Sequence, residues 1–451
     1  MKTMKQNTKL FMNIYLCSLL IGPFIYYIVF HLLSTDSSYY ICVEIEHLDF
    51  FLNNFEFKFI YPVSCDQINY YLGFENMNNI ITTNEHPYQN RPLYILFVSI
   101  VSRILNFVFV LFGININFLF QLSTFLVQLF IVSSGIYLII KTFDVKGLNF
   151  LHLIILCFIF FLNPIVKWGI FTPSHQLLTF PVIASGLYIL SSKNNLSLFW
   201  ISLIFGLLFM AHRAFLIIYL LYVLNKLFLQ KKRLSYILNN FKFTILFLLP
   251  YIFYTIYIRL LGYEPYDAAT QYWGQFIWVF YYFMNIVKHS GEWYCQTIPE
   301  NFICYFKDTI KTLYYLCLPI LFSVFNFQLF KKIKNYKTKK FEINLSLIVL
   351  VLFIFWSFIG WYPPLRFNLY SIGNGLILVL AIQYLYLNKL NEKIFFLTSL
   401  IFYFLFLNHW NFENVIYFHP AYLLSAVSMI IFIIISYRNF DSNVNEDERF
   451  L

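Results

Sequence analysis

Long apolar runs recur along the whole chain, and they constrain its fold more than any other feature. Of its 451 residues, 60% are hydrophobic and 12% are charged, whereas roughly a quarter of the residues in soluble domains are charged. Runs of about 18 or more apolar residues are typical of helices that span a membrane. In lipid the backbone must satisfy its own hydrogen bonds, which leaves helices and closed barrels. Because the runs are continuous and do not alternate, we expect an all-α, polytopic transmembrane protein.

About twelve segments are predicted to span the membrane. The segment 197–227 is about 46 Å long at 1.5 Å per residue, more than one bilayer crossing, and Ala211-His212-Arg213 interrupts it. It is therefore either one unusually long, interrupted span or two short half-spans. The N-terminal run to Leu33 is too long for the apolar part of a signal peptide, so we interpret it as the first span. The segments lie near residues 9–33, 93–112, 118–140, 148–163, 175–191, 197–227, 243–261, 310–330, 344–360, 368–387, 394–408 and 420–437.

The basic residues orient these spans. Lys and Arg cluster in short loops, which favours a cytoplasmic position for those loops and accounts for the net charge of +10 without a nucleic-acid partner. Both chain ends are then predicted to lie inside. The same count leaves Lys141 and Lys146 on the outer side, against this preference. The loops predicted to be cytoplasmic carry Lys231-Lys232-Arg233, the run 331–340, and Lys389 with Lys393.

Two long connections, 34–92 and 262–309, are predicted to lie outside the cytoplasm. Both are rich in aromatic residues and poor in Gly and Pro, so we expect short helices along the membrane surface rather than disorder. We divide the chain into an N-terminal module, residues 1–230, which includes the first long loop, and a C-terminal module, residues 231–451, which includes the second.

The cysteines agree with this placement. Cys42 and Cys65 lie in the first long loop, and Cys295 and Cys304 lie in the second. Cysteines in loops outside the cytoplasm fit disulfide bonds in an oxidising compartment. Three pairings are possible; we favour a local link within each loop, with unpaired thiols as the alternative. The remaining cysteines, Cys17, Cys157 and Cys317, lie in apolar spans, where cysteine packs as a small hydrophobic residue.

The second half of the first long loop carries the residues that most suggest chemistry. Asp66 is followed four residues later by Tyr70. A carboxylate that is partly desolvated near a membrane has a raised pKa, closer to the working range of a general base. Asp36, which also precedes tyrosines, is an alternative base, and a solvated loop acid is the purely structural alternative. Glu85 and His86 are competing acid–base candidates.

Two arginines stand at positions that the positive-inside preference does not explain. Arg91 precedes Pro92 at the outer end of a predicted span. Proline suits the first turn of a helix, and the guanidinium fork matches the oxygens of a phosphate; contact with lipid headgroups is the alternative. Arg213, next to His212, lies in an apolar segment, where a charge is costly and usually functional. If two half-spans meet there, both side chains are interfacial instead.

Several weak motifs occur in an order that resembles a known family. Asp66 with Tyr70, and then Arg91-Pro92-Leu93-Tyr94, resemble the acid after the first span and the motif opening the second in the GT-C superfamily of integral-membrane glycosyltransferases. Later elements are similar in the same order, roughly over residues 10–230 and more loosely beyond. They are Asn163-Pro164, Thr172-Pro173-Ser174-His175, the run GLLFMAHRAF at 206–215, and Pro363-Pro364-Leu365-Arg366-Phe367. Asp66 lies farther from the first span than the family's acid usually does.

The resemblance implies transfer of a sugar from a polyprenyl-phosphate donor to a glycan, lipid or protein acceptor on the outer face of a bacterial inner membrane. It implies Asp66 as the base, with Arg91 and Arg366 near the lipid phosphate. No metal and no cofactor are expected. The other residues implied in substrate binding are Tyr70, Glu85, His86 and Arg213.

Two other functions remain open at this point. An O-antigen-type polymerase is also polytopic and aromatic-rich, but such enzymes rely on outer-loop arginines, and the two long loops here contain only Arg91. A transporter or flippase typically has two similar halves with polar residues at mid-membrane, and no halved symmetry is visible in this sequence.

Overall fold

The computed structural model describes seven stretches of the chain, residues 2–27, 91–114, 119–143, 148–162, 175–191, 196–229 and 233–265. It also describes isolated residues between 70 and 89, residues 166 and 170, and short pieces between 347 and 400. Helix dominates these residues and no strand occurs among them, which confirms the all-α prediction for this part of the chain. The prediction of surface helices in the second long loop lies almost wholly outside the described residues, as do most of the spans predicted beyond residue 310.

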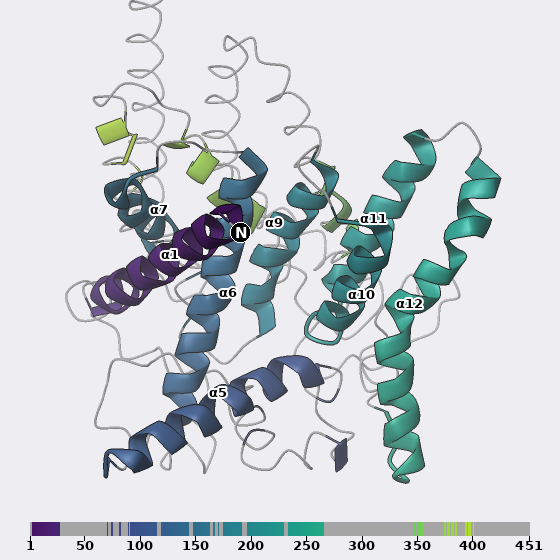
Figure 1. The fold of residues 1–451 in the computed structure, drawn as a ribbon, viewed down its shortest axis with the longest axis horizontal. Coiled ribbons are helices and arrows are strands. Elements are labelled where there is room, and N and C mark those ends of the chain that lie inside the picture. Colours follow the sequence, from purple (N-terminus) through teal and green to yellow (C-terminus); the bar gives the residue numbers. More distant parts are fainter. Residues whose placement is uncertain are drawn as a thin grey trace, which may run out of the picture.

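The described helices, labelled as in Figure 1, follow most of the predicted spans to within about three residues; α1 instead begins at Lys2, seven residues before the span predicted from residue 9. Within the described residues, α5, α6 from Leu122 and α12 from Phe241 are long and apolar enough to cross a membrane. The α12 helix begins at Arg233, ten residues before the predicted span, because the polar residues that precede the apolar run, among them Arg233 and Lys242, are also helical. The elements are α1 (Lys2–Tyr27), α5 (Pro92–Leu111), α6 (Leu119–Phe143), α7 (Phe150–Leu162), η4 (His175–Leu178), α9 (Thr179–Leu190), α10 (Leu198–Phe209), α11 (Ala214–Leu229) and α12 (Arg233–Leu260).

The awkward segment 197–227 is two helices. The α10 helix ends at Phe209, four residues form a turn, and α11 begins at Ala214. The two helices pack against each other, so the chain reverses direction at the Ala211-His212-Arg213 interruption. This result confirms the alternative of two short segments rather than one long span.

A glycine allows α10 and α12 to approach closely. A Cβ atom added at Gly206 would lie 2.3 Å from the backbone oxygen of Phe247, so only glycine fits there without a shift of backbone. Close backbone approach at small residues is typical of helix pairs in membranes. The ring of Phe247 stacks on Tyr219 of α11, with ring centroids 4.3 Å apart, so α10, α11 and α12 form one packed unit.

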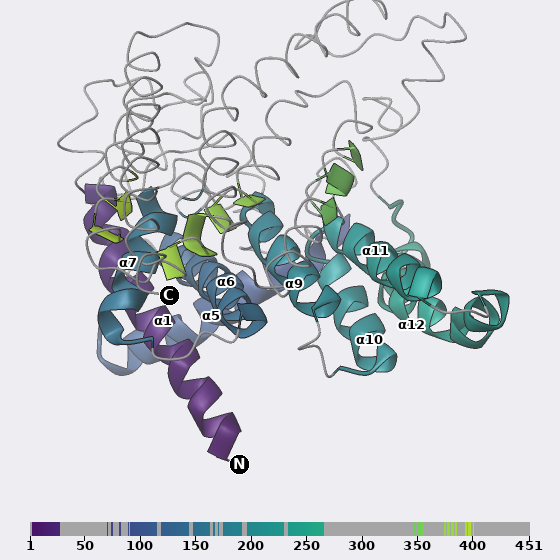
Figure 2. The same ribbon diagram turned by 90° about the horizontal axis from the view of Figure 1, so that it is seen from above.

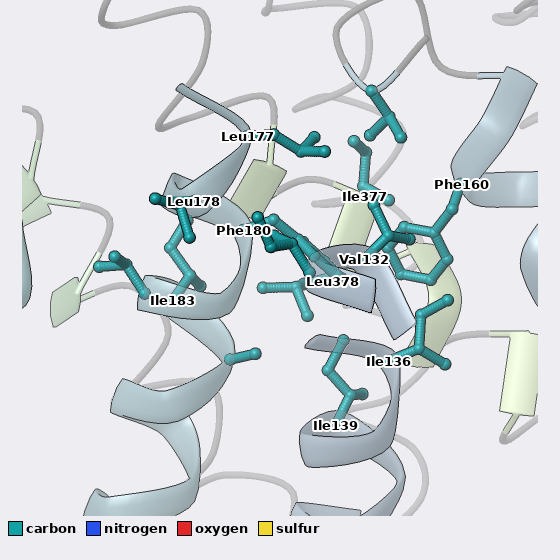
Figure 3. Close-up of a cluster of buried hydrophobic side chains, with 14 of the residues drawn as sticks. Val132, Ile136, Ile139, Phe160, Leu177, Leu178, Phe180, Ile183, Ile377 and Leu378 are labelled. Carbon is teal, nitrogen blue, oxygen red and sulfur yellow. The ribbon is translucent and has the colours of Figure 1, made fainter. Parts of the chain in front are cut away.

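The core lies where α6, α7 and α9 meet. Gly135 of α6 leaves room for the ring of Phe180, which would lie 2.2 Å from an added Cβ. Phe180 in turn contacts Phe160 of α7 at 4.8 Å between ring centroids. Figure 3 shows the surrounding cluster, with Val132, Ile136, Ile139, Leu177, Leu178, Ile183, Ile377 and Leu378 converging on these rings.

Polar side chains join α1 to α6 and α7 inside this apolar packing. The hydroxyl of Ser133 donates to Ser18 at 3.2 Å, and Ser18 lies 3.6 Å from the sulfur of Cys157. Cys17 and Cys157 are both fully buried and not in disulfides. The prediction that these two cysteines pack inside helices is therefore confirmed.

The bundle has two distinct ends. Figure 1 shows α6 ending, α11 ending and α12 beginning at one end, and the α10–α11 turn, the end of α12 and all of α5 at the other. Seen from above, α1, α6 and α7 group on one side and α10, α11 and α12 on the other, with α9 between them (Figure 2). The end of the bundle where α6 and α11 end is called the lysine end, because Lys141 donates to Asn7 there and Lys393 lies 3.2 Å from His152.

Candidate functional site

Arg91 lies at the end opposite the lysines, where the first loop meets α5. It occupies the N-cap position, with Pro92 as the first helical residue, and its carbonyl accepts the Tyr94 N–H at 3.2 Å. The side chain is half-buried. Its Nη1 donates to the hydroxyl of Tyr70 at 3.5 Å, the outer limit of a hydrogen bond. Arg91 and Tyr70, both predicted as site residues, are therefore brought together.

Two buried tyrosines form one wall of the site. Tyr70 and Tyr94 are each 3% exposed, and their rings meet edge to face with centroids 5.8 Å apart. The hydroxyl of Tyr94 accepts a hydrogen bond of 2.8 Å from Nε2 of Gln128, a fully buried residue of α6. A buried amide or phenol without a hydrogen-bond partner is destabilising. This bond therefore fixes the start of α5 against α6.

His212 belongs to the same site although it is 121 residues from Arg91. It lies in the turn between α10 and α11, 2% exposed, and its Nδ1 accepts the Ala214 N–H at 3.2 Å. That bond satisfies one of the N–H groups that a helix start leaves unpaired. Burial, and then the positive charge of Arg91, lower the pKa of His212 to about 3. The imidazole is therefore neutral at physiological pH and carries its proton on Nε2.

Gln89 ties the site to the far end of α12. Its Nε2 donates to the backbone oxygens of Ile81 and Glu264, at 3.0 and 3.2 Å. Its own backbone oxygen accepts from the hydroxyl of Tyr254, at 2.9 Å. Gln89 is 1% exposed, whereas its partners are partly exposed. Gln89, two residues before Arg91, is thus held both by the preceding segment at Ile81 and by the C-terminal part of α12 with the residues that follow it.

The site holds one positive charge among neutral polar groups. The guanidinium of Arg91 donates to the phenol of Tyr70, and the imidazole of His212 is close enough for the charge of Arg91 to lower its pKa. Among the described residues, no carboxylate pairs with Arg91. A half-buried cation with neutral groups beside it suits an anion such as a phosphate, because the interaction strengthens as water is excluded.

Arg213 lies in the same turn as His212. It is half-buried, and its backbone oxygen accepts the Leu216 N–H at 3.0 Å, which starts α11. The prediction that Arg213 is interfacial if two helices meet there fits the observed turn. The remaining predicted residues lie outside the described part of the chain, namely Asp66, Asp36, Glu85, His86 and Arg366 for the site, and Cys42, Cys65, Cys295 and Cys304 for the disulfides.

Sequence reasoning did not assign four residues of this site. His212 attracts attention only as a polar neighbour of Arg213, and Gln89, Gln128 and Tyr254 receive no role. The available signal for the two glutamines is their polarity next to or inside apolar helices, where an amide needs a partner. Their partners lie between 8 and 175 residues away in the sequence, which local pattern does not reveal.

Comparisons of the chain with protein-family models, with curated proteins and with solved structures gave no match. The site is therefore interpreted from its own geometry.

Proposed function

We propose that this protein is a membrane glycosyltransferase that moves a sugar from a polyprenyl-phosphate donor to an acceptor outside the cytoplasm. The observation that carries the proposal is the environment of Arg91. This half-buried arginine contacts Tyr70, lies near the neutral His212, and is at the end of the bundle opposite the lysines. Lys and Arg are enriched on the cytoplasmic side of membrane proteins, so the position opposite the lysines supports the proposal of a site on the outer face of a multi-pass protein in the bacterial inner membrane.

Arg91 has the chemistry that the leaving group needs. When the bond between the anomeric carbon and the phosphate oxygen breaks, negative charge develops on the lipid phosphate. A guanidinium placed in a site of low dielectric constant stabilises that charge more in the transition state than in the ground state. The neutral His212 does not repel the guanidinium, as an imidazolium would.

Asp66 is proposed as the general base. Its carboxylate takes the proton of the acceptor hydroxyl while that oxygen attacks the anomeric carbon, and the polyprenyl phosphate leaves with the bonding electrons. Asp66 precedes Tyr70 by four residues in the sequence, and Tyr70 contacts Arg91. That connection supports a position for Asp66 close to the site.

The proposal assigns the other predicted residues to substrate binding. Arg366 joins Arg91 at the lipid phosphate, and Arg213 faces the interface from the α10–α11 turn. Glu85 and His86, which precede Arg91 in the same loop, are proposed to contact the sugar or its acceptor. The acceptor class is a glycan, a lipid or a protein, and neither a metal nor a cofactor is part of the proposed reaction.

The test is a profile of surface glycans in the native host. We would compare a deletion strain with strains that express the wild-type protein, Asp66→Asn or Arg259→Gln at matched membrane abundance. Arg259 is the control because it is an exposed arginine near the end of α12 and takes no part in the site. The expected result is loss of one sugar decoration, with glycan chain length kept, in the deletion and Asp66→Asn strains only.

Three other outcomes have distinct meanings. Collapse of polymer length to single units would replace the glycosyltransferase by a polymerase. Wild-type glycans in the Asp66→Asn strain, together with a defect in the deletion strain, would move the base to Asp36. A deletion strain with unchanged glycans would contradict the proposal altogether.

A further inference from the structure

We propose that α5 does not cross the membrane but lies obliquely in its outer interface. Its exposed apolar stripe then faces the boundary of the acyl chains, and Arg103 lies among the phosphates of the outer lipid headgroups. By length and apolarity alone α5 qualifies as a span, and the sequence predicts one at 93–112. The inference concerns how the chain meets lipid, and it does not rest on the proposed enzymatic function.

The contact between α5 and α6 fixes their relative depth. Tyr94, the third residue of α5, bonds to Gln128, the tenth residue of α6, at 2.8 Å. From Gln128, α6 extends about 22 Å to Phe143 near the lysine end, but only about 13 Å back to Leu119. A crossing α5 would place its first turn at one end of α6, and instead that turn meets α6 well inside its length.

The direction of α5 follows from the short link to α6. If α5 ran toward the lysine end, Leu111 would lie about 25 Å beyond Gln128 and about 38 Å from Leu119. The seven residues between Leu111 and Leu119 reach about 28 Å when fully extended, which is too short. α5 therefore runs the other way, as Figure 1 shows, and passes across the end of the bundle that holds the α10–α11 turn.

The side chains of α5 suit an interfacial position. Arg103 and Asn106 are both exposed, one turn apart, in the middle of the helix. In a crossing helix Arg103 would face lipid near the bilayer midplane, where charged residues are rare and costly. In an interfacial helix the same arginine reaches the headgroup phosphates. Exposed apolar residues also lie on the face of Arg103, where Val110 is one, but most form a stripe that would contact the acyl boundary: Phe97, Ile100, Ile104, Phe107, Val108 and Leu111.

Removing α5 from the spans also improves the charge distribution, because three lysines (Lys141, Lys146 and Lys193) move to the cytoplasmic side and only Lys167 moves to the outer side. With α1 running outward and α5 staying outside, α6 runs inward, so that Lys141 and Lys146 fall on the cytoplasmic side. The α10–α11 hairpin supplies one crossing more than the single span predicted at 197–227, so the orientation of α12 is unchanged. The basic groups that then share the side of the N-terminus are Lys141, Lys146, Lys193, Lys226 and Lys231-Lys232-Arg233.

The experiment inserts one epitope tag either after Gly113 or after Lys146 in the full-length protein. Antibody is applied to intact spheroplasts and to permeabilised ones, and both proteins must elute as single peaks in detergent. We expect the tag after Gly113 to be reached from outside and the tag after Lys146 only after permeabilisation. Any other combination overturns the inference; a crossing α5 gives the exact reverse.

A second measurement identifies what covers the apolar stripe. A photoreactive phenylalanine analogue placed at Phe107, which is 67% exposed, is irradiated in native membranes and its adducts are identified by mass spectrometry. We expect adducts to phospholipid. Adducts to a second copy of the chain, or to another protein, would show a protein interface instead and would overturn the assignment to lipid.

Discussion

The two ends of the helix bundle treat their basic residues in opposite ways. At the lysine end, Lys141 and Lys226 lie over tyrosine rings of their own helices, 5.7 and 5.6 Å from the ring centroids. At the other end, Arg91 is half-buried beside a phenol and a neutral imidazole. A lysine on an aromatic ring at a helix end is a membrane-surface anchor. A partly desolvated arginine held by distant segments of the chain is instead preorganised for an anion.

The two ends differ in how many polar side chains they bury. The bonds at the lysine end, such as that from Lys141 to Asn7, are only partly buried and lie at the margin of the packed core. The Arg91 end buries Tyr94, Gln128, His212 and Gln89 almost completely, and each must keep its hydrogen bonds to avoid a penalty. Buried polar groups of this kind are expected where function requires them.

The largest expected effect is on transfer itself. Arg91→Lys keeps the charge but removes the planar fork that matches a phosphate, so the rate of sugar transfer should fall about 10²- to 10³-fold. The rate would be measured as sugar incorporation into the surface glycan after induced expression, with Arg259→Gln as the control arginine. Transfer at the wild-type rate in Arg91→Lys would remove Arg91 from the phosphate site.

His212 makes stability depend on pH. Its pKa is about 3 in the fold and about 6.5 when unfolded, so below about pH 6.5 the unfolded chain binds the extra proton. The stabilisation is complete above pH 6.5, and it falls by about 1.4 kcal/mol per pH unit as the pH drops toward 3. Thermal unfolding in detergent at several pH values should show this loss in the wild type.

The matched variant for this prediction is His212→Gln, which stays neutral at every pH. It should be less stable than the wild type at pH 7.5 and should lose less stability between pH 6.5 and 4. Parallel curves for the two proteins would mean that His212 is not a buried neutral imidazole.

Gly206→Ala should weaken the packing of α10 on α12. The added methyl group meets the backbone oxygen of Phe247, which cannot rotate away as a side chain would, so the free energy of unfolding should fall by about 1–3 kcal/mol. Gly262→Ala is the control, because Gly262 has a φ of 84° but open space around it. That variant isolates the backbone strain, about 1–2 kcal/mol. A Gly206→Ala protein as stable as the wild type would contradict the close approach.

Tyr94→Phe should cost about 1–2 kcal/mol, because it leaves the buried Gln128 amide without the phenol that accepts from it. Its melting temperature in detergent should recover in the double variant Tyr94→Phe with Gln128→Leu, since both polar groups are then gone. If the double variant is as unstable as the sum of the two single ones, the hydrogen bond is not what joins α5 to α6.

Lys141→Gln at the lysine end should have the smallest effect, below about 1 kcal/mol on stability, with transfer unchanged. Its melting temperature and glycan profile would be compared with those of the wild type. A loss of transfer as large as that in Arg91→Lys would abolish the distinction between the two ends.

The sequence predicted single elements better than their contacts. Apolar runs gave α5 and α6 nearly to the residue, and the polar interruption at Ala211-His212-Arg213 predicted the division into α10 and α11. Tyr70 and Arg91 were predicted to share a site. The electrostatic link between His212 and Arg91 was not predicted, because periodicity shows which face of a helix is apolar but not which distant segment covers it.

The position of α5 shows the same limit. Its 20 residues satisfy the length and apolarity criteria for a span, and only the bond between Tyr94 and Gln128 reveals that its first turn meets α6 about 13 Å from Leu119. Arg103 was a signal in the sequence, since a charge in the middle of an apolar run argues against a crossing. The site residues of the first loop and of the last spans remain predictions.

The most direct test of the central claim compares the two ends in one host. Strains that express the wild type, Arg91→Lys or Lys141→Gln at equal abundance would be analysed by mass spectrometry for surface glycans and for polyprenyl-phosphate-linked sugars. The account predicts that Arg91→Lys lacks one decoration and accumulates the lipid-linked sugar, while Lys141→Gln matches the wild type. If the two variants behave alike, whether both normal or both defective, the functional difference between the ends is contradicted.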